Sequence, residues 1–197
     1  AAAIVLLPIA LSVALLASYT PSDKTAQISV VQPNVPCYEE ERIAASKFDP
    51  REDIKRLMAD VPDDADYVLM PESALAYIPT IGSIDEAHLD FIAPELKTLF
   101  GDNLSGTKLI TGASTIVRYG DNQATDTAHH YPNYGWYDQY NSALAVDSEG
   151  HVEYIYHKGK LVIGVEAVPL KSLFDLFEVD LGGVSGQLGW GEKHSVF

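Results

Sequence analysis

The amino terminus is a continuous apolar run that differs in pattern from everything after it. Residues 1–18 read AAAIVLLPIALSVALLAS, and no charged residue precedes Asp23. As a helix rising about 1.5 Å per residue, the run would measure roughly 27 Å, close to the thickness of a bilayer core. The pattern predicts a transmembrane helix over residues 1–20. A buried core helix and a secretory signal peptide are the alternatives, although a signal peptide needs a basic leader.

Beyond this run, short apolar segments rich in β-branched residues predict strands. A tight turn at residues 147–150 makes the last two of them a hairpin. The predicted strands are residues 27–32 (QISVVQ), 67–70 (YVLM), 108–115 (KLITGAST), 141–146 and 151–157.

Amphipathic segments lie between these strands and predict helices. Residues 38–61 are charged and are interrupted at Pro50, which favours two short helices or one broken helix. Ser83 is suited to cap a further helix over residues 84–100, which Pro94 would kink or divide. Strands that alternate with helices and end in a strand pair indicate an α/β layered fold. The size of residues 21–197 suits one domain.

The charge of the chain limits its partners. With 13 basic and 28 acidic residues, the net charge is −15, and a nucleic-acid surface needs clustered Lys and Arg. Any contact of the folded part with a membrane should therefore be apolar. The single cysteine, Cys37, excludes an internal disulfide and a multi-cysteine metal site.

No cofactor or metal is expected. The glycines of residues 182–191 lack the strand-then-helix context of a phosphate loop. His129 and His130 are adjacent and cannot easily share a metal, so a surface loop is the simpler interpretation.

Glu72 is the first candidate for chemistry. It follows an apolar strand and Pro71, which places its carboxylate at the carboxyl end of a strand, where open α/β folds bind ligands. Taken alone, Pro71-Glu72-Ser73 is equally typical of a strand that passes into a loop.

Lys158 and Glu166 are the second and third candidates. Lys158 ends the strand 152–157, where a lysine often only protects a sheet edge from further pairing. Glu166 lies in the apolar segment LVIGVEAVPL, and an unpaired carboxylate would be costly to bury there. A cationic partner is implied, and Lys158 and Lys160 are the nearest.

Five ordered segments together resemble the nitrilase superfamily of carbon-nitrogen hydrolases, and within it the apolipoprotein N-acyltransferase family. The pattern YHK-x-x-LV-x-x-x-E-x-VPL points to the acyltransferases in particular. The five segments are VVQPNV (30–35), YVLMPESA (67–74), LITGAS (109–114), YNSALAV (140–146) and YHKGKLVIGVEAVPL (156–170).

This resemblance implies an α-β-β-α sandwich with a Glu-Lys-Cys triad. Glu72 would be the general base, Lys158 the triad lysine and Glu166 a supporting glutamate. The family moves an acyl chain from a phospholipid to the diacylglyceryl cysteine of a lipoprotein, at the periplasmic face of the bacterial inner membrane. The sequence departs from the family at Ile163 and Val165, which replace a proline and a phenylalanine.

Two expectations complete this interpretation. Glu72 and Lys158 should lie close together, because base and oxyanion stabiliser must flank one thiol. The nucleophilic cysteine should lie beyond Phe197, since Cys37 is followed by an acidic run that disfavours a thiolate. A nitrilase-superfamily amidase acting on a small amide and a non-catalytic, membrane-tethered binding module are the alternative functions.

Overall fold

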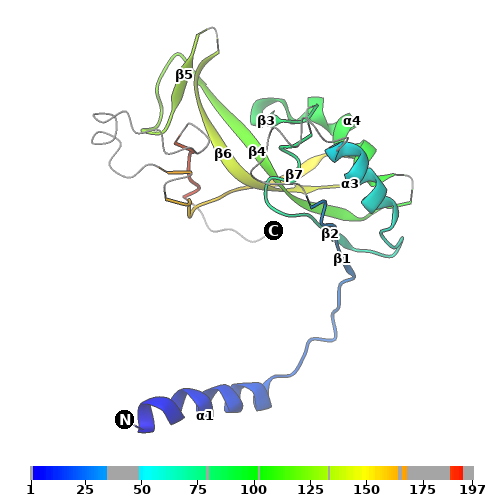
Figure 1. Ribbon diagram of the computed structural model, residues 1–197, viewed down its shortest axis with the longest axis vertical. Coiled ribbons are helices and arrows are strands. Elements are labelled where there is room, and N and C mark those ends of the chain that lie inside the picture. The colour runs from blue at the N-terminus through cyan, green and yellow to red at the C-terminus, as the bar shows by residue number, and fades with distance from the viewer. Residues whose placement is uncertain are drawn as a thin grey trace.

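A seven-stranded mixed sheet forms the centre of the computed structural model, which describes residues 2–34, 49–78, 80–101, 103–132, 134–163, 166–167 and 187–192 (Figure 1). The main path of the sheet is β1-β2-β4-β6-β5, with β3 beside β4 and β7 beside β6. The strands are β1 Ile28–Val30, β2 Tyr67–Leu69, β3 Ser83–Asp85, β4 Lys108–Gly120, β5 His129–Tyr131, β6 Gly135–Val146 and β7 Val152–His157.

The sheet combines a parallel half and an antiparallel half. Strands β1, β2 and β4 run parallel, as do β3 and β4, whereas β6 is antiparallel to β4, β5 and β7. The turn between β6 and β7 contains Gly150 at φ 87°, a left-handed conformation that glycine adopts readily. The predicted α/β class and the predicted hairpin are therefore confirmed.

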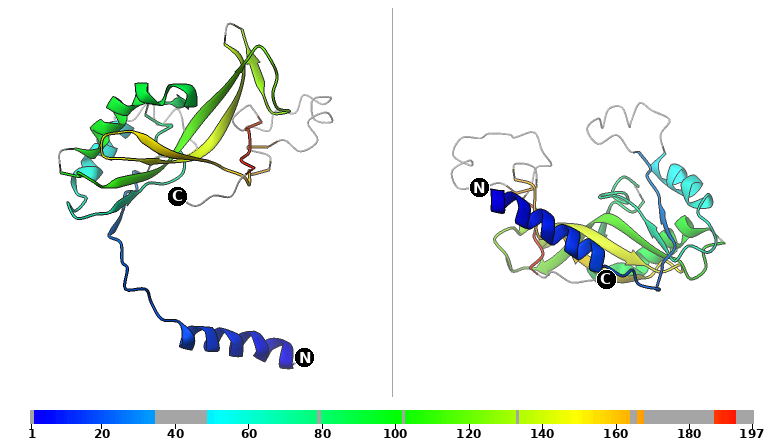
Figure 2. Two further views of the ribbon diagram at one scale, coloured as in Figure 1. Left: turned by 180° about the vertical axis from the view of Figure 1, so that it is seen from behind. Right: turned by 90° about the horizontal axis from the view of Figure 1, so that it is seen from below.

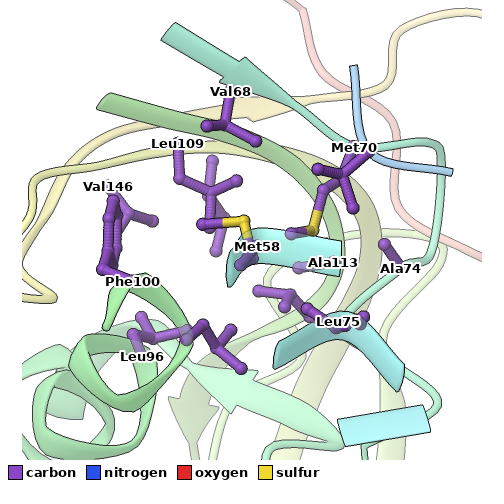
Figure 3. Close-up of a cluster of buried hydrophobic side chains, with 14 of the residues drawn as sticks. Met58, Val68, Met70, Ala74, Leu75, Leu96, Phe100, Leu109, Ala113 and Val146 are labelled. Atoms are coloured by element: carbon purple, nitrogen blue, oxygen red, sulfur yellow. The ribbon is translucent and has the colours of Figure 1, made fainter. Parts of the chain in front are cut away.

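Helices α3 (Pro50–Ala59) and α4 (Leu89–Phe100) cover one face of this sheet. Asp49 caps α3 by accepting hydrogen bonds from the backbone N–H groups of Arg51 and Glu52, and Pro50 occupies the first turn, where its missing N–H costs nothing. Figure 3 shows the buried cluster between the two layers, to which both helices and strands β2, β3, β4 and β6 contribute. Its labelled members are Met58, Val68, Met70, Ala74, Leu75, Leu96, Phe100, Leu109, Ala113 and Val146.

The predicted helix over residues 84–100 begins later than expected. Ser83–Asp85 instead forms β3, which pairs with β4 from Ser114 to Ile116. The Asp85 carboxylate then caps a short 3₁₀ turn, Glu86–His88, by accepting from the Ala87 N–H at 3.1 Å, and α4 follows. Pro94 lies inside α4 without dividing it.

The apolar run forms helix α1 (Ala2–Ser18), which stands apart from the sheet at the end of an extended segment (Figures 1 and 2). It has 17 residues, with Pro8 inside it. Within the described ranges, no helix has both the length and the apolarity needed to cross a membrane. The prediction of a transmembrane helix over residues 1–20 is therefore not supported.

The antiparallel half extends further than the sequence predicted. Strands β4 and β6 form a long hairpin that carries β5 at its far end (Figure 1). His129 and His130 lie in β5, so the prediction of a surface loop is wrong: both pair with β6 residues. The described residues supply one helical layer and one sheet of the expected α-β-β-α sandwich; two further layers are not among them.

Candidate active site

Glu72 lies just beyond the carboxyl end of β2. The Met70 N–H donates to the Ile110 carbonyl at 2.9 Å, which carries the parallel pairing one residue past the strand. Pro71 then ends the pairing, and Ser73 adopts φ 59° as the chain turns. The sequence Pro-Glu-Ser thus directs the Glu72 carboxylate away from the strand, as the sequence predicted.

The turn that holds Glu72 rests directly on Gly112 of β4. A Cβ atom at Gly112 would lie 2.4 Å from Ser73 N and 2.6 Å from Glu72 Cα, distances at which something must shift. The close approach is fixed by hydrogen bonds from Gly112 N–H to the Pro71 carbonyl at 3.2 Å and from Leu75 N–H to the Gly112 carbonyl at 3.1 Å. A glycine is therefore required here for Glu72 to reach its position.

Lys158 follows β7 directly and is held by its backbone on both sides. Its N–H donates to the Asn141 carbonyl on β6 at 2.8 Å, and its carbonyl accepts from the Gly191 N–H at 3.1 Å. These contacts continue the antiparallel pairing of β6 and β7, so the Lys158 side chain leaves the sheet beside Asn141.

The Lys158 ammonium lies between two carboxylates. Nζ is 3.0 Å from Oε1 of Glu72 and 3.0 Å from Oε1 of Glu166. The prediction that Glu72 and Lys158 lie close together is confirmed, and Lys158 rather than Lys160 is the partner of Glu166. Strands distant in the sequence thus bring the three predicted site residues to one point.

Asn141 is a fourth member of this cluster, and the sequence analysis did not single it out. Its Nδ2 donates to Glu72 Oε1 at 2.5 Å and to Glu166 Oε1 at 2.6 Å. One amide group therefore links the two carboxylates and holds them around the ammonium. The segment YNSALAV, quoted for the family resemblance, contains this asparagine just before the apolar end of β6.

Glu166 is the buried member of the cluster, with 8% of its surface exposed. Burial alone would raise its pKa, but the Val162 N–H, at 2.7 Å from Oε2, together with Asn141 and Lys158, outweighs burial and lowers the pKa below the ordinary value of 4.5. Glu166 is therefore ionised at neutral pH and balances the charge of Lys158.

Lys158 is also kept charged. Burial acts to lower its pKa, but the hydrogen bonds and charges of Glu166 and Glu72 outweigh burial and raise the pKa above 10.5. A permanent ammonium can stabilise a negative charge that develops on a reacting oxygen, but it cannot serve as a base at neutral pH.

Glu72 differs from Glu166 in exposure. Its side chain is 60% exposed, against 10% for Glu166 and 26% for Lys158. Both hydrogen bonds to Glu72 end on Oε1, and Oε2 accepts none from the described residues. Glu72 is thus the carboxylate of the pair that has capacity to accept a proton from an incoming group.

A cavity of about 250 Å³ adjoins the cluster and could admit a reacting group. Glu72, Asn141 and Lys158 supply its polar side. Met70, Ile110, Ala143 and Tyr156 are among the residues of its apolar side. An apolar space beside a charged cluster suits a carbonyl compound with a hydrocarbon portion.

Several predicted features fall outside the described residues. Cys37 is one of them, and Val165 of the departure from the family pattern is another. Ile163, the other departure, forms an isolated bridge with Ala167, next to Glu166. The described part of the chain contains no cysteine, so the cluster as described has two carboxylates and a cation but no thiol.

Comparison with known proteins gives matches among solved structures only. No family model matches the chain, and no curated protein matches it. An amidase (NitN) from Nesterenkonia sp. AN1 is 14% identical, with a TM-score of 0.42, over 86% of this chain and 51% of the amidase. A mutant of that amidase, with the acetamide moiety of fluoroacetamide on its active-site cysteine, is 15% identical with a TM-score of 0.43.

An N-terminal amidase bound to a Gln-Val peptide is also similar in structure, at 15% identity and a TM-score of 0.34, over 70% of this chain and 28% of that one. The chain spans about half the length of the Nesterenkonia amidase. Likeness of this degree identifies no reaction, so the geometry of the Glu72 cluster has to carry the functional argument.

Proposed function

We propose that the chain carries the acyl-transfer site of a nitrilase-superfamily enzyme, in which Glu72 is the general base and Lys158 stabilises the oxyanion. One observation carries this proposal: Lys158 Nζ lies 3.0 Å from an exposed carboxylate, Glu72, and 3.0 Å from a buried one, Glu166. Glu166 is a positioning residue, because it holds the lysine and does not line the cavity. Asn141 also lines the cavity, but its amide group is occupied in holding Glu72 and Glu166.

The reaction requires a cysteine thiol as the nucleophile. Glu72 takes the thiol proton as sulfur attacks a carbonyl carbon, and Lys158 stabilises the resulting oxyanion. The C–O or C–N bond then breaks, and the leaving group takes the proton from Glu72, which leaves a thioester. In the second step an amine or water attacks the thioester and gives its proton to Glu72, and the thiolate takes that proton back as it leaves.

The more specific proposal is an apolipoprotein N-acyltransferase. The acyl donor would be a phospholipid, and the acceptor the amine of a lipoprotein's diacylglyceryl cysteine, at the periplasmic face of the bacterial inner membrane. Support comes from the segment YHKGKLVIGVEAVPL, which combines Lys158 with Glu166 at a spacing of eight residues. The ion pair between these two residues is consistent with this interpretation of the spacing and supports the proposal.

An amidase acting on a small amide is the second candidate, and the size of the cavity favours it. About 250 Å³ beside Glu72 and Lys158 is enough for a short acyl group but not for a long lipid chain. The same two steps would apply, with an amide as donor and water as the second nucleophile.

A two-substrate assay on the full-length protein distinguishes these functions. It uses a fluorescent phospholipid with a diacylated lipopeptide in one arm and short aliphatic amides in the other. Formation of a triacylated lipopeptide supports the acyltransferase, and release of ammonia from the amides supports the amidase. No product in either arm would refute both and favour a binding module.

The ion pair between Lys108 and Glu153 provides matched controls. This pair joins β4 to β7, with Nζ 2.6 Å from Oε2, but it is exposed and neither residue lines the cavity. Glu72→Gln and Lys158→Ala should each remove activity, whereas Lys108→Ala and Glu153→Gln should retain it.

A further inference from the structure

A second and larger cavity has a volume of about 640 Å³, and Tyr156 lines both this cavity and the one beside Glu72. Its walls come from residues 124–127, strands β6 and β7, and residues 190–192. The last segment is held against β6 by a hydrogen bond from Gly189 N–H to the Gln139 carbonyl at 2.9 Å (Figure 1, red). The proposed acyl transfer uses no polar residue of this cavity.

The charge of the cavity is negative. Asp126, Asp138 and Glu192 line it, and no lysine or arginine is among its lining residues. His157 also lines it, but its Nε2 is already 2.7 Å from Glu86 Oε1. The cavity therefore disfavours anions and attracts cations.

Asp138 gives the strongest evidence for a missing ligand. It has no exposed surface, and its Oδ1 has no hydrogen-bond partner among the described residues. Its Oδ2 accepts from Thr125 at 2.6 Å, Tyr119 at 2.9 Å and Tyr140 at 3.4 Å. All three donors are neutral hydroxyls, so no described cation balances this buried carboxylate.

The tyrosines around Asp138 cannot supply that balance. Burial, followed by hydrogen bonds with Tyr140 and Asp138, raises the pKa of Tyr119 above its usual range, so its hydroxyl stays protonated and neutral. An uncompensated buried charge is costly, and a cation bound nearby would reduce that cost.

Aromatic residues form a large part of the remaining walls. Tyr140, Tyr154, Tyr156 and Trp190 all line the cavity, and the Trp190 side chain is half exposed. Aromatic faces attract ammonium groups and also bury hydrocarbon. The acidic and histidine residues of the described part form no group of three that could hold a metal ion. Separated carboxylates with aromatic walls fit an organic cation better than a metal.

We propose that this cavity binds an alkylammonium or arylalkylammonium compound. The negative charges of Asp138, Asp126 and Glu192 attract the ammonium group. The organic part lies against the tyrosines and Trp190. Binding requires no acyl donor, so it can be tested independently of the proposed acyl transfer.

Tryptophan fluorescence gives a direct test in the full-length chain. The chain has two tryptophans, and Trp136→Phe leaves Trp190 as the reporter within residues 1–197. The probe is phenethylammonium, with 2-phenylethanol as the neutral analogue and 3-phenylpropionate as the anionic one. We expect saturable binding of phenethylammonium at least about tenfold tighter than that of either analogue.

Substitutions identify the residues responsible. Asp138→Asn should weaken phenethylammonium binding about tenfold, whereas Asp121→Asn, an equal change of charge at an exposed turn outside the cavity, should leave it unchanged. Glu192 and Asp126 lie nearer the surface, and Glu192→Gln and Asp126→Asn should each weaken binding severalfold. These two variants test the proposal even if Asp138→Asn does not fold. Equal affinity for the neutral analogue, or wild-type affinity in the Glu192 and Asp126 variants, would overturn the proposal.

Discussion

Asn141 and Glu166 are joined by a hydrogen bond of 2.6 Å from Nδ2 to Oε1, and the same amide reaches Glu72 Oε1 at 2.5 Å. Two carboxylates this close would repel each other without donors between them. Asn141 and Lys158 supply those donors. One buried carboxylate, Glu166, and one exposed carboxylate, Glu72, each lie 3.0 Å from the same ammonium. Glu166 therefore supports the lysine, and Glu72 is the carboxylate available to a reacting group.

Asn141→Ala should therefore reduce both stability and activity. It removes two charge-assisted hydrogen bonds, and we expect a loss of about 1–3 kcal/mol in the free energy of unfolding, measured by urea titration. Asn103→Ala is the control, because Asn103 donates to Asp63 at 2.9 Å on the exposed surface and should cost less than about 0.5 kcal/mol. Equal effects of the two substitutions would deny Asn141 its role.

The lowered pKa of Glu166 predicts a dependence of stability on pH. A carboxyl whose pKa is lower in the folded state adds stability above its unfolded value, here close to 4.5, and loses it as the pH falls through the lower folded value. The free energy of unfolding should therefore fall on acidification below about pH 4.5.

Glu166→Gln isolates this contribution. The difference in unfolding free energy between wild type and variant should shrink as the pH falls through that window, because Asp85 and Asp147, whose pKa values are also lowered, remain in both proteins. A difference that stays constant from about pH 7 to pH 3 would show that Glu166 does not titrate as described.

The sequence predicted the positions of the candidate site residues better than their surroundings. Glu72, Lys158 and Glu166 follow or adjoin apolar segments, so strand ends could be recognised and their convergence inferred. Asn141 was missed because the hydrophobic pattern of a strand does not distinguish a functional polar residue from one that only faces solvent. Its role depends on the register that places Asn141 opposite Ser114 and beside Lys158.

Elements set by tertiary pairing were also harder to predict. Residues 83–85 have a capping serine and an acidic residue that suit a helix start, yet they pair with β4. The Ser83 and Ser114 hydroxyls lie 3.0 Å apart across that pair, a contact that local sequence does not encode. The hairpin of β4 and β6 likewise extends through residues whose composition resembles a loop.

Gly112→Ala should displace Glu72. The added methyl would overlap Ser73 N and Glu72 Cα, and we expect a loss of about 1–3 kcal/mol in stability together with a fall in activity per folded molecule. Gly120→Ala is the control: its Cβ meets nothing within 4 Å, but φ of 68° strains it. It should lose about 1 kcal/mol while the activity of the folded fraction stays normal.

Cys37 should not be the nucleophile. It lies outside the described residues, and the acidic residues after it disfavour a thiolate. Cys37→Ala in the full-length protein should therefore retain its acyl-transfer or amidase activity, measured as product formed per minute. Loss of activity in Cys37→Ala, with folding intact by circular dichroism, would assign the thiol to this residue.

The most direct test of the proposed site is the thioester itself. Full-length protein is incubated with phospholipid in one sample and a short amide in another, each without an amine acceptor. Both samples are quenched with acid during the first turnover, before water releases the acyl group, and the intact mass is recorded. In the wild type, we expect the mass of one acyl group added to a cysteine. In Glu72→Gln and Lys158→Ala, this adduct should be absent or should form several orders of magnitude more slowly. Lys108→Ala and Glu153→Gln should form it at the wild-type rate. A wild-type protein that forms no adduct from either donor, or a Glu72→Gln or Lys158→Ala variant that forms it at the wild-type rate, would contradict the account.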